Sequence, residues 1–184
     1  MVNCTSKTYQ MKREILTFSN KISRKLPKPE KKFIADMNYG ILASNSCLLT
    51  DIVDQLHEHS KKINSVDRLS RHLSKGTPKD ALRAYLTHIK KWCPAHPVIH
   101  IDDSDVVKPD GYKFESLGWV RDGSESTSTK NVYKKGYHVT EATVLTNNNH
   151  PVSLFSKIHS SNEKGFTSIN NITFFAMERA AALF

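Results

Sequence analysis

Three carboxylates follow directly on a short apolar segment in the middle of the chain. Residues 98–105 read Val-Ile-His-Ile-Asp-Asp-Ser-Asp, so Asp102, Asp103 and Asp105 come at the end of a strand predicted over residues 98–101. Mg²⁺ prefers hard oxygen ligands in rigid geometry, and the end of a strand can fix such ligands. Asp102 and Asp103 are therefore candidate metal ligands.

The acidic segment has three interpretations. It can be a polar turn, because Asp and Ser are favoured turn residues. It can also be the nucleophile loop of a haloacid-dehalogenase-like phosphotransferase, with Asp103 attacking phosphorus and Asp105 as the acid/base. The paired downstream aspartates that such enzymes use for Mg²⁺ are missing from the sequence. The third interpretation is the first strand of a ribonuclease-H-like nuclease or transposase, which supplies one metal-binding Asp.

The elements around this segment divide the chain into two parts. Apolar residues at helical spacing predict helices over residues 9–26, 30–42, 46–59, 64–73 and 77–93. From residue 98 the pattern becomes that of strands: 98–101, 118–121 as a strand or turn, and a hairpin of 137–146 and 151–158. A helix starts near residues 168–171 and shows no capping residue before Phe184, which we take as the sign of an interrupted domain. The predicted class is α/β (α+β), with a basic helical DNA-binding region over 1–97 and the first part of a catalytic domain over 98–184.

Positive charge is concentrated in the first part. Residues 1–97 contain 18 Lys and Arg against 8 Asp and Glu, whereas residues 98–184 contain 9 against 10. Such an excess suits a phosphate backbone, although a basic solvated surface has the same composition. The predicted helices 64–73 and 77–93 have the size of a helix-turn-helix, a pattern that any small bundle can show. The candidate DNA contacts there are Arg68, Arg71, His72 and Lys75.

Six segments occur in an order that is hard to produce by chance. They are residues 101–109 (IDDSDVVKP), 120–124 (VRDGS), 136–139 (GYHV), 145–146 (LT), 150–154 (HPVSL) and 160–163 (SSNE). Together they resemble bacterial insertion-sequence transposases of the DDE type, over roughly residues 33–184 of the chain.

This resemblance implies a ribonuclease-H-like domain that opens with an Asp-bearing strand, continues with antiparallel strands and then a helix. An Asp-x-Ser motif at the first strand makes Asp102 the first catalytic carboxylate, with Ser104 beside it and Asp103 as the alternative. It also implies Mg²⁺ as the cofactor and the double-stranded DNA of transposon ends as the partner. It allows the protein to form a homo-oligomer but does not require it. The second Asp and the Glu of the family have no counterparts here. We therefore expect the chain alone to be inactive, and a truncated form acting as a DNA-binding repressor is the alternative function.

Several residues of the second part have weaker signals. Arg121, Lys134 and Lys135 are candidate phosphate contacts near the acidic segment, or simply solvated charges. Trp119 and Tyr137 are predicted to pack in the core or a loop. The histidines form no ligand set, which predicts structural roles for His100, His138 and His159.

The remaining composition indicates a cytoplasmic protein. No apolar run is long enough to cross a bilayer, and the first residues lack the apolar core of a secretory signal. Cys4, Cys47 and Cys93 are odd in number and far apart, which predicts free thiols.

Overall fold

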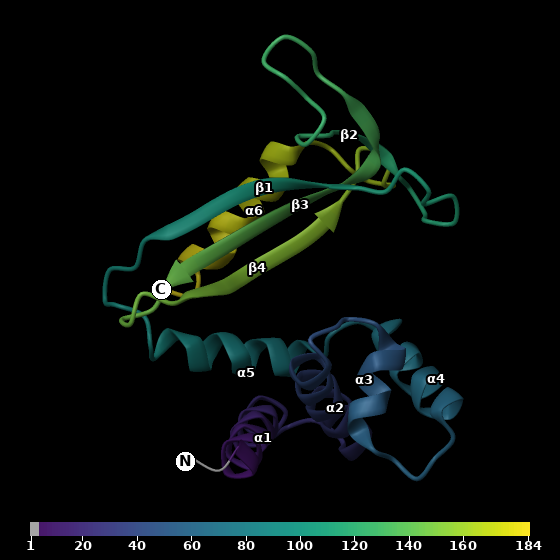
Figure 1. Ribbon diagram of the computed structural model, residues 1–184. Helices are drawn as coiled ribbons and strands as arrows, with labels where there is room; N and C mark the ends of the chain where they lie inside the picture. The colour runs from purple at the N-terminus through teal and green to yellow at the C-terminus, as the bar shows by residue number, and fades with distance from the viewer. Residues whose placement is uncertain (1–3) are drawn as a thin grey trace. The chain divides into compact units, whose positions relative to one another are not determined.

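The computed structural model describes residues 4–184, which form two compact units divided between His88 and Ile89. The described residues contain six helices and four strands, a mixed α and β composition as predicted (Figure 1). The helices are α1 (Cys4–Ile22), α2 (Lys28–Ser44), α3 (Leu49–Leu56), α4 (Lys62–Leu73), α5 (Lys79–Lys90) and α6 (Ile169–Ala181). The strands are β1 (Ile99–Val107), β2 (Gly118–Arg121), β3 (Tyr133–Leu145) and β4 (Pro151–His159). The sequence places the division after residue 97, and the structure places it after His88, inside α5.

The first unit is a helical bundle around its own apolar core. Ile52 and Leu69 are fully buried at its centre. The other buried apolar side chains of this core are Ile22, Leu26, Phe33, Ile34, Val53 and Ala81. Gly40 allows α2 and α3 to approach closely, because an added Cβ there would overlap the side chain of Ile52. Burial of one helix stripe against its neighbours explains why the 3.6-residue pattern located these helices.

The turns between the helices use residues suited to them. Pro27 precedes α2 in an extended conformation. A second proline, Pro29, lies in the first turn of α2, where the missing backbone N–H costs the helix no hydrogen bond. Asn45 and His57 end α2 and α3 in the left-handed region, with φ of 52° and 49°. Both endings are of the type that stops a helix through an αL residue.

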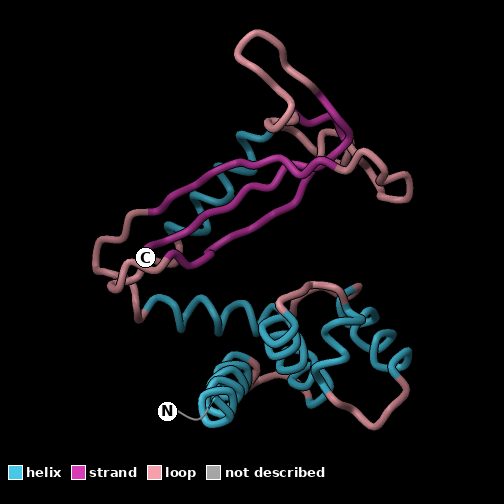
Figure 2. The backbone as a smooth tube through the Cα atoms, viewed as in Figure 1, coloured by secondary structure: helices cyan, strands magenta, loops and turns pink. Residues whose placement is uncertain are grey.

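The second unit is built on β3, which pairs antiparallel on both sides (Figure 2). Along one edge of β3 lies β1, in register from Ile99 opposite Val144 to Val107 opposite Gly136. Along the other edge β2 pairs with the start of β3 and β4 with the rest, with an irregularity between Ala142 and Thr143. Among the described residues β1 therefore lies at an edge of the sheet.

Helix α6 covers one face of this sheet and contacts β3, β4 and β1 (Figure 1). Its buried residues Ile172, Ala176 and Ala180 pack on the face that presents Ala142 and Val144, both fully buried. Ser168 caps the helix by accepting a hydrogen bond from the Asn171 backbone N–H. The sequence predicts continuation to Phe184, but α6 ends at Ala181.

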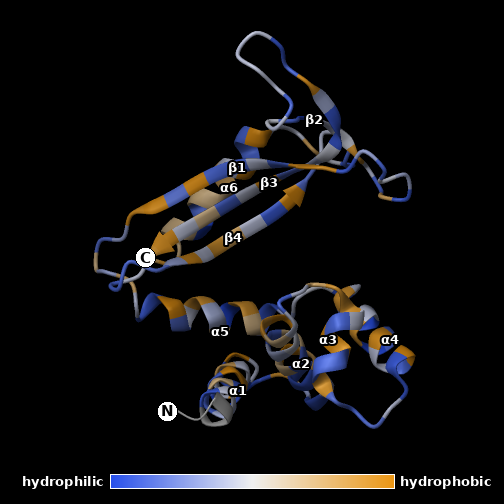
Figure 3. Cartoon of the chain, viewed as in Figure 1, coloured by the Kyte–Doolittle hydropathy of each residue, from blue (hydrophilic) through white to orange (hydrophobic). Residues whose placement is uncertain are grey.

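Strand β1 is longer than predicted. The sequence predicts a strand that stops at residue 101, whereas β1 runs to Val107 and includes all three aspartates. Figure 3 shows its start as hydrophobic and its middle as largely hydrophilic. Pairing with β3 keeps the acidic residues extended, although their types favour turns.

Two predictions from composition can be followed in the structure. Among residues 4–184, none of the helices combines the length and the apolar composition needed to cross a membrane. Cys47 and Cys93 are free thiols, and the side chain of Cys4 lies outside the described residues, as do residues 1–3 used to judge a secretory signal.

Candidate functional site

The aspartates of β1 point to opposite faces of the sheet. Successive side chains of a strand alternate, so Asp103 and Asp105 share the face covered by α6, and Asp102 and Ser104 share the other. They lie inside a strand rather than in a loop at its end. This differs from the nucleophile loop that the phosphotransferase interpretation predicts.

Asp103 is fixed by a hydrogen-bonded chain across three strands. The Thr140 hydroxyl donates to Asp103 Oδ1, and the Thr140 oxygen lies 2.9 Å from His159 Nε2. Because a hydroxyl has one proton, Nε2 carries the hydrogen and donates to Thr140. Thr140 and His159 are buried, so this chain holds the Asp103 carboxylate in one orientation.

Asp105 is held in a similar way by the neighbouring histidine. Its Oδ1 lies 2.6 Å from His138 Nδ1, and the rings of His138 and His159 stack with centroids 5.6 Å apart. Burial lowers the pKa of His159, and the nearby His138 lowers it further.

On the face opposite α6, Asp102 lies directly across from Glu141 of β3. Like charges directly opposite each other in a sheet are destabilising, unless a cation or a basic group compensates them. This face therefore offers two neighbouring carboxylates, Asp102 and Glu141, and Asp102 is the residue that the sequence favours as a metal ligand.

The described residues do not fit the three-carboxylate Mg²⁺ site that the resemblance implies. Each face supplies two acidic side chains from neighbouring positions. No group of three or more His, Cys, Asp or Glu residues within residues 4–184 is placed to hold a metal ion. What the arrangement supplies is oriented carboxylates, with Asp103 the more rigidly held because its oxygen accepts from the buried Thr140.

An open hollow of about 500 Å³ adjoins the acidic strand. Asp105 and Val107 line one side, and Arg121 to Ser124 line the other. Of the three aspartates of β1, Asp105 lines this hollow, together with Arg121 at the end of β2.

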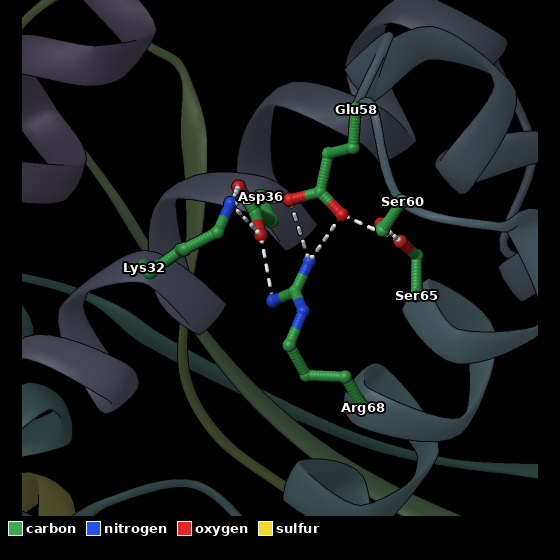
Figure 4. A network of polar contacts seen from close by, with 6 residues as sticks. All are labelled: Lys32, Asp36, Glu58, Ser60, Ser65 and Arg68. Atoms are coloured by element: carbon green, nitrogen blue, oxygen red, sulfur yellow. Dashed lines mark hydrogen bonds and ion pairs between the residues drawn. The ribbon is translucent and has the colours of Figure 1, made fainter.

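In the helical unit, Arg68 takes part in a network of polar contacts (Figure 4). Its Nη2 is 3.0 Å from Glu58 Oε1, and its Nη1 is 2.8 Å from Asp36 Oδ2, in an angle unsuited to a hydrogen bond. Lys32 joins the same two carboxylates at 2.6 and 2.9 Å. Arg68, predicted as a DNA contact, therefore connects α4 to α2 and to the segment after α3.

The other three predicted DNA contacts of this unit differ in whether they pack within the bundle or face solvent. His72 stacks on Phe33 with centroids 5.0 Å apart, so it packs within the bundle. Arg71 and Lys75 are exposed at the end of α4. Of the four predicted residues, these two present their charges to solvent.

The three basic residues predicted near the acidic strand also have different surroundings. Lys134 contacts Asp122 at 2.9 Å and Glu125 at 2.5 Å. The hydrogen bond from Ser124, followed by that from Lys134, lowers the pKa of Asp122 to about 2. Lys135 lies over the ring of Trp119, with Nζ 4.6 Å from the centroid. Arg121 is exposed at the end of β2.

Some residues of the site were not predicted from sequence. Trp119, predicted to pack in the core or a loop, is 59% exposed in β2, and Tyr133 on the adjoining strand is 56% exposed. Thr140 and His159 had no functional signal. The alternation of Gly136, His138, Thr140 and Ala142 along β3 would have placed His138 and Thr140 on one face.

The chain matches no known family model, no curated protein and no solved structure.

Proposed function

We propose that this chain contains the DNA-binding region and the first catalytic strand of a DDE-type transposase, acting in the cytoplasm on the ends of an insertion sequence. The observation that carries the proposal is the order of elements in the second unit. An Asp-bearing strand, β1, pairs antiparallel with β3, β3 with β4, and α6 follows and covers the sheet. This is the order that the resemblance implies for the start of a ribonuclease-H-like domain.

The helical unit supports a role in binding duplex DNA. Basic residues greatly exceed acidic ones in this part of the chain, and a surface of that kind attracts a phosphate backbone. Arg71 and Lys75 are exposed together at the end of α4, whereas Arg68 and His72 support the bundle. The proposed contact is therefore the surface around Arg71 and Lys75.

The carboxylates of β1 support the catalytic part of the proposal. Asp102 matches the Asp-x-Ser position of the resemblance, and Asp103 is the alternative with the more rigid support. Because each face supplies two carboxylates, we expect this chain to bind ends without cutting or joining them. A sensitive strand-transfer assay with Mg²⁺ or Mn²⁺ that gives cleavage at the ends would contradict this expectation.

The charge of the helical unit can be tested with the double substitution Arg71→Ala and Lys75→Ala. Loss of two phosphate contacts should weaken duplex binding by about tenfold or more and reduce the slope of log K against log salt by roughly two. Fluorescence anisotropy with a labelled duplex at several salt concentrations measures both quantities.

The matched control is the pair Lys164→Ala and Arg179→Ala, two exposed basic residues of the second unit. This pair removes the same charge and should change affinity less than threefold. Equal weakening by the two pairs would show that binding follows net charge alone, and the proposed contact surface would be wrong.

One alternative function is favoured by a specific observation. Exposed Arg71 and Lys75, together with two carboxylates on each face, suit a DNA-binding regulator that competes with an active transposase for the ends. Retention on end DNA without cleavage, together with inhibition of an active enzyme added to the same ends, would identify it. The phosphotransferase alternative is less well supported, because Asp103 and Asp105 lie within an antiparallel strand.

A further inference from the structure

Strand β2 and the start of β3 form a two-stranded ribbon with an unusual face. Trp119 lies opposite Lys135, and Arg121 lies opposite Tyr133. Because alternate residues of a strand share a face and opposite residues face the same way, all four side chains lie on one side of the ribbon. We call this surface the ribbon face.

The ribbon face is exposed and positively charged. Trp119 and Tyr133 are more than half exposed, and the Lys135 ammonium lies over the Trp119 ring. On the other side of the ribbon, Val120 is buried and Lys134 pairs with both Asp122 and Glu125. Lys134 thus compensates part of the acidic charge of the loop on that side, and Arg121 and Lys135 give the aromatic side its positive charge.

We propose that the ribbon face binds DNA at unpaired bases, with Trp119 and Tyr133 stacking on bases and Arg121 and Lys135 contacting phosphates. Every base has a face on which an aromatic ring can stack, and basic side chains beside the rings follow the backbone. The inference rests on the proposed function only for the choice of DNA as the nucleic acid.

The spacing of the rings favours unpaired bases over a duplex. Trp119 and Tyr133 are diagonal neighbours on adjacent strands, and such positions lie about 7 to 8 Å apart. Bases stacked in a duplex are spaced by about 3.4 Å, roughly half that distance. Two successive bases can therefore each stack on one of these rings only where they are separated from each other.

The ribbon face lies on the same side of the sheet as Glu141 and its partner Asp102. Alternation along β3 places Tyr133, Lys135 and Glu141 on the same side, and Glu141 is the partner of Asp102. Glu141 lies six positions after Lys135 along the strand, which is a distance of about 20 Å. DNA held on the ribbon face could thus extend toward the carboxylates of that face.

The experiment uses the full chain and three labelled DNAs: a 20-nucleotide single strand, a blunt duplex, and the same duplex with a four-nucleotide single-stranded overhang. Trp119→Ala should weaken binding to the single strand and the overhang about tenfold, because stacking contributes roughly 1 to 3 kcal/mol per base. Blunt-duplex binding should change less than twofold. Trp119→Phe should restore most of the affinity, and Lys135→Gln should lower the salt slope by about one.

The control is Phe174→Ala, which removes another aromatic ring that is 60% exposed, on α6. It should leave all three affinities unchanged. In a Trp92→Phe background, the single strand should quench the remaining Trp119 fluorescence. Tyr133→Ala provides a second substitution with the same expected selectivity, and circular dichroism verifies folding of each variant.

The outcomes separate this inference from the proposed function. The ribbon face is not the site if the Trp119→Ala and Tyr133→Ala variants bind the overhang DNA with the same affinity as the unchanged chain. The same conclusion follows if the single strand does not quench Trp119 fluorescence. Blunt-duplex binding that depends on Arg71 and Lys75 would then still support the proposed function. If the Trp119 and Tyr133 substitutions weaken binding to the overhang, but the Arg71 and Lys75 substitutions do not weaken binding to the blunt duplex, the inference stands and the proposed function fails. Tighter binding of a single-stranded RNA through Trp119 would overturn the choice of DNA.

Discussion

Glu58 is the residue on which the polar network of the helical unit depends. It accepts a hydrogen bond from Ser65 at 2.6 Å, and it contacts Lys32 at 2.6 Å and Arg68 at 3.0 Å. Burial raises the pKa of Glu58, but the hydrogen bonds from Lys32, Ser65 and Arg68 outweigh it and bring the pKa to about 2. The ordinary pKa of a glutamate side chain, which we take for the unfolded chain, is 4.5. The stability contributed by ionised Glu58 is therefore fully present above pH 4.5 and is lost as the pH falls toward 2.

Glu58→Gln should lower the free energy of unfolding by about 2 kcal/mol at pH 7, because Arg68 then keeps a single carboxylate partner in a half-buried position. The difference between the variant and the unchanged chain should shrink as the pH falls from 4.5 toward 2, because the Glu58 carboxylate then takes up a proton more readily in the unfolded chain than in the folded one. Urea titrations at pH 7, 5 and 3.5, followed by circular dichroism, measure it.

Asp80→Asn is the control for this substitution. Asp80 and Arg83 are 3.7 Å apart and both are well exposed, so the change should cost less than about 0.5 kcal/mol. A Glu58→Gln effect that stays constant between pH 7 and 3.5 would show that the carboxylate charge is not what stabilises the unit.

At the scale of elements, helices were the easiest part to predict. Phe33, Ile34, Met37 and Ile41 recur at helical spacing, and α2 forms where this stripe can be buried. The pattern does not show which charged residues meet across helices. Arg68 carries the charge expected of a DNA contact, and its partners Asp36 and Glu58 are brought to it only by the packing of α2, α3 and α4.

Strand β1 shows the corresponding limit for the sheet. Asp and Ser favour turns, and a strand ending at residue 101 is the natural prediction from β1 alone. The partner strand decides otherwise, because β3 offers hydrogen bonds as far as Gly136 opposite Val107. Which aspartates share a face follows from that extension, so the division between Asp102 and Asp103 could not be derived from the local sequence.

Gly136 is the residue of β3 that pairs with both β1 and β2, opposite Val107 and opposite Gly118. An added Cβ would overlap the carbonyl oxygen of Val106 and lie 2.6 Å from Val120 Cγ2. Gly136→Ala should therefore destabilise the second unit by about 1 to 3 kcal/mol, since neither the backbone nor a buried side chain can move aside easily. Urea unfolding followed by tryptophan fluorescence reports the change.

Gly123→Ala is the matched substitution in the adjoining loop, where an added Cβ would meet nothing within 4 Å. It should change stability by less than about 0.5 kcal/mol. Equal effects at the two glycines would mean that the junction of β1, β2 and β3 is not tightly packed around Gly136.

At the scale of the whole molecule, each unit has a core of its own. Leu69 is fully buried in the helical unit, and Val144 is fully buried beneath α6 in the sheet unit. Both tryptophans, Trp92 and Trp119, belong to the second unit, whereas five of the six helices begin in the first. Tryptophan fluorescence therefore follows the sheet unit, and circular dichroism at 222 nm follows mainly the helical one.

Leu69→Ala should lower the stability of the helical unit by about 2 to 5 kcal/mol, because it leaves a cavity in a closed core. The urea midpoint measured by circular dichroism should fall, and the midpoint measured by fluorescence should stay. Val144→Ala should do the reverse, with a smaller shift of about 1 to 3 kcal/mol because fewer carbon atoms are removed. If both midpoints move together in both variants, the chain unfolds as one cooperative body, and separate roles for a DNA-binding unit and a sheet unit would need a different physical basis.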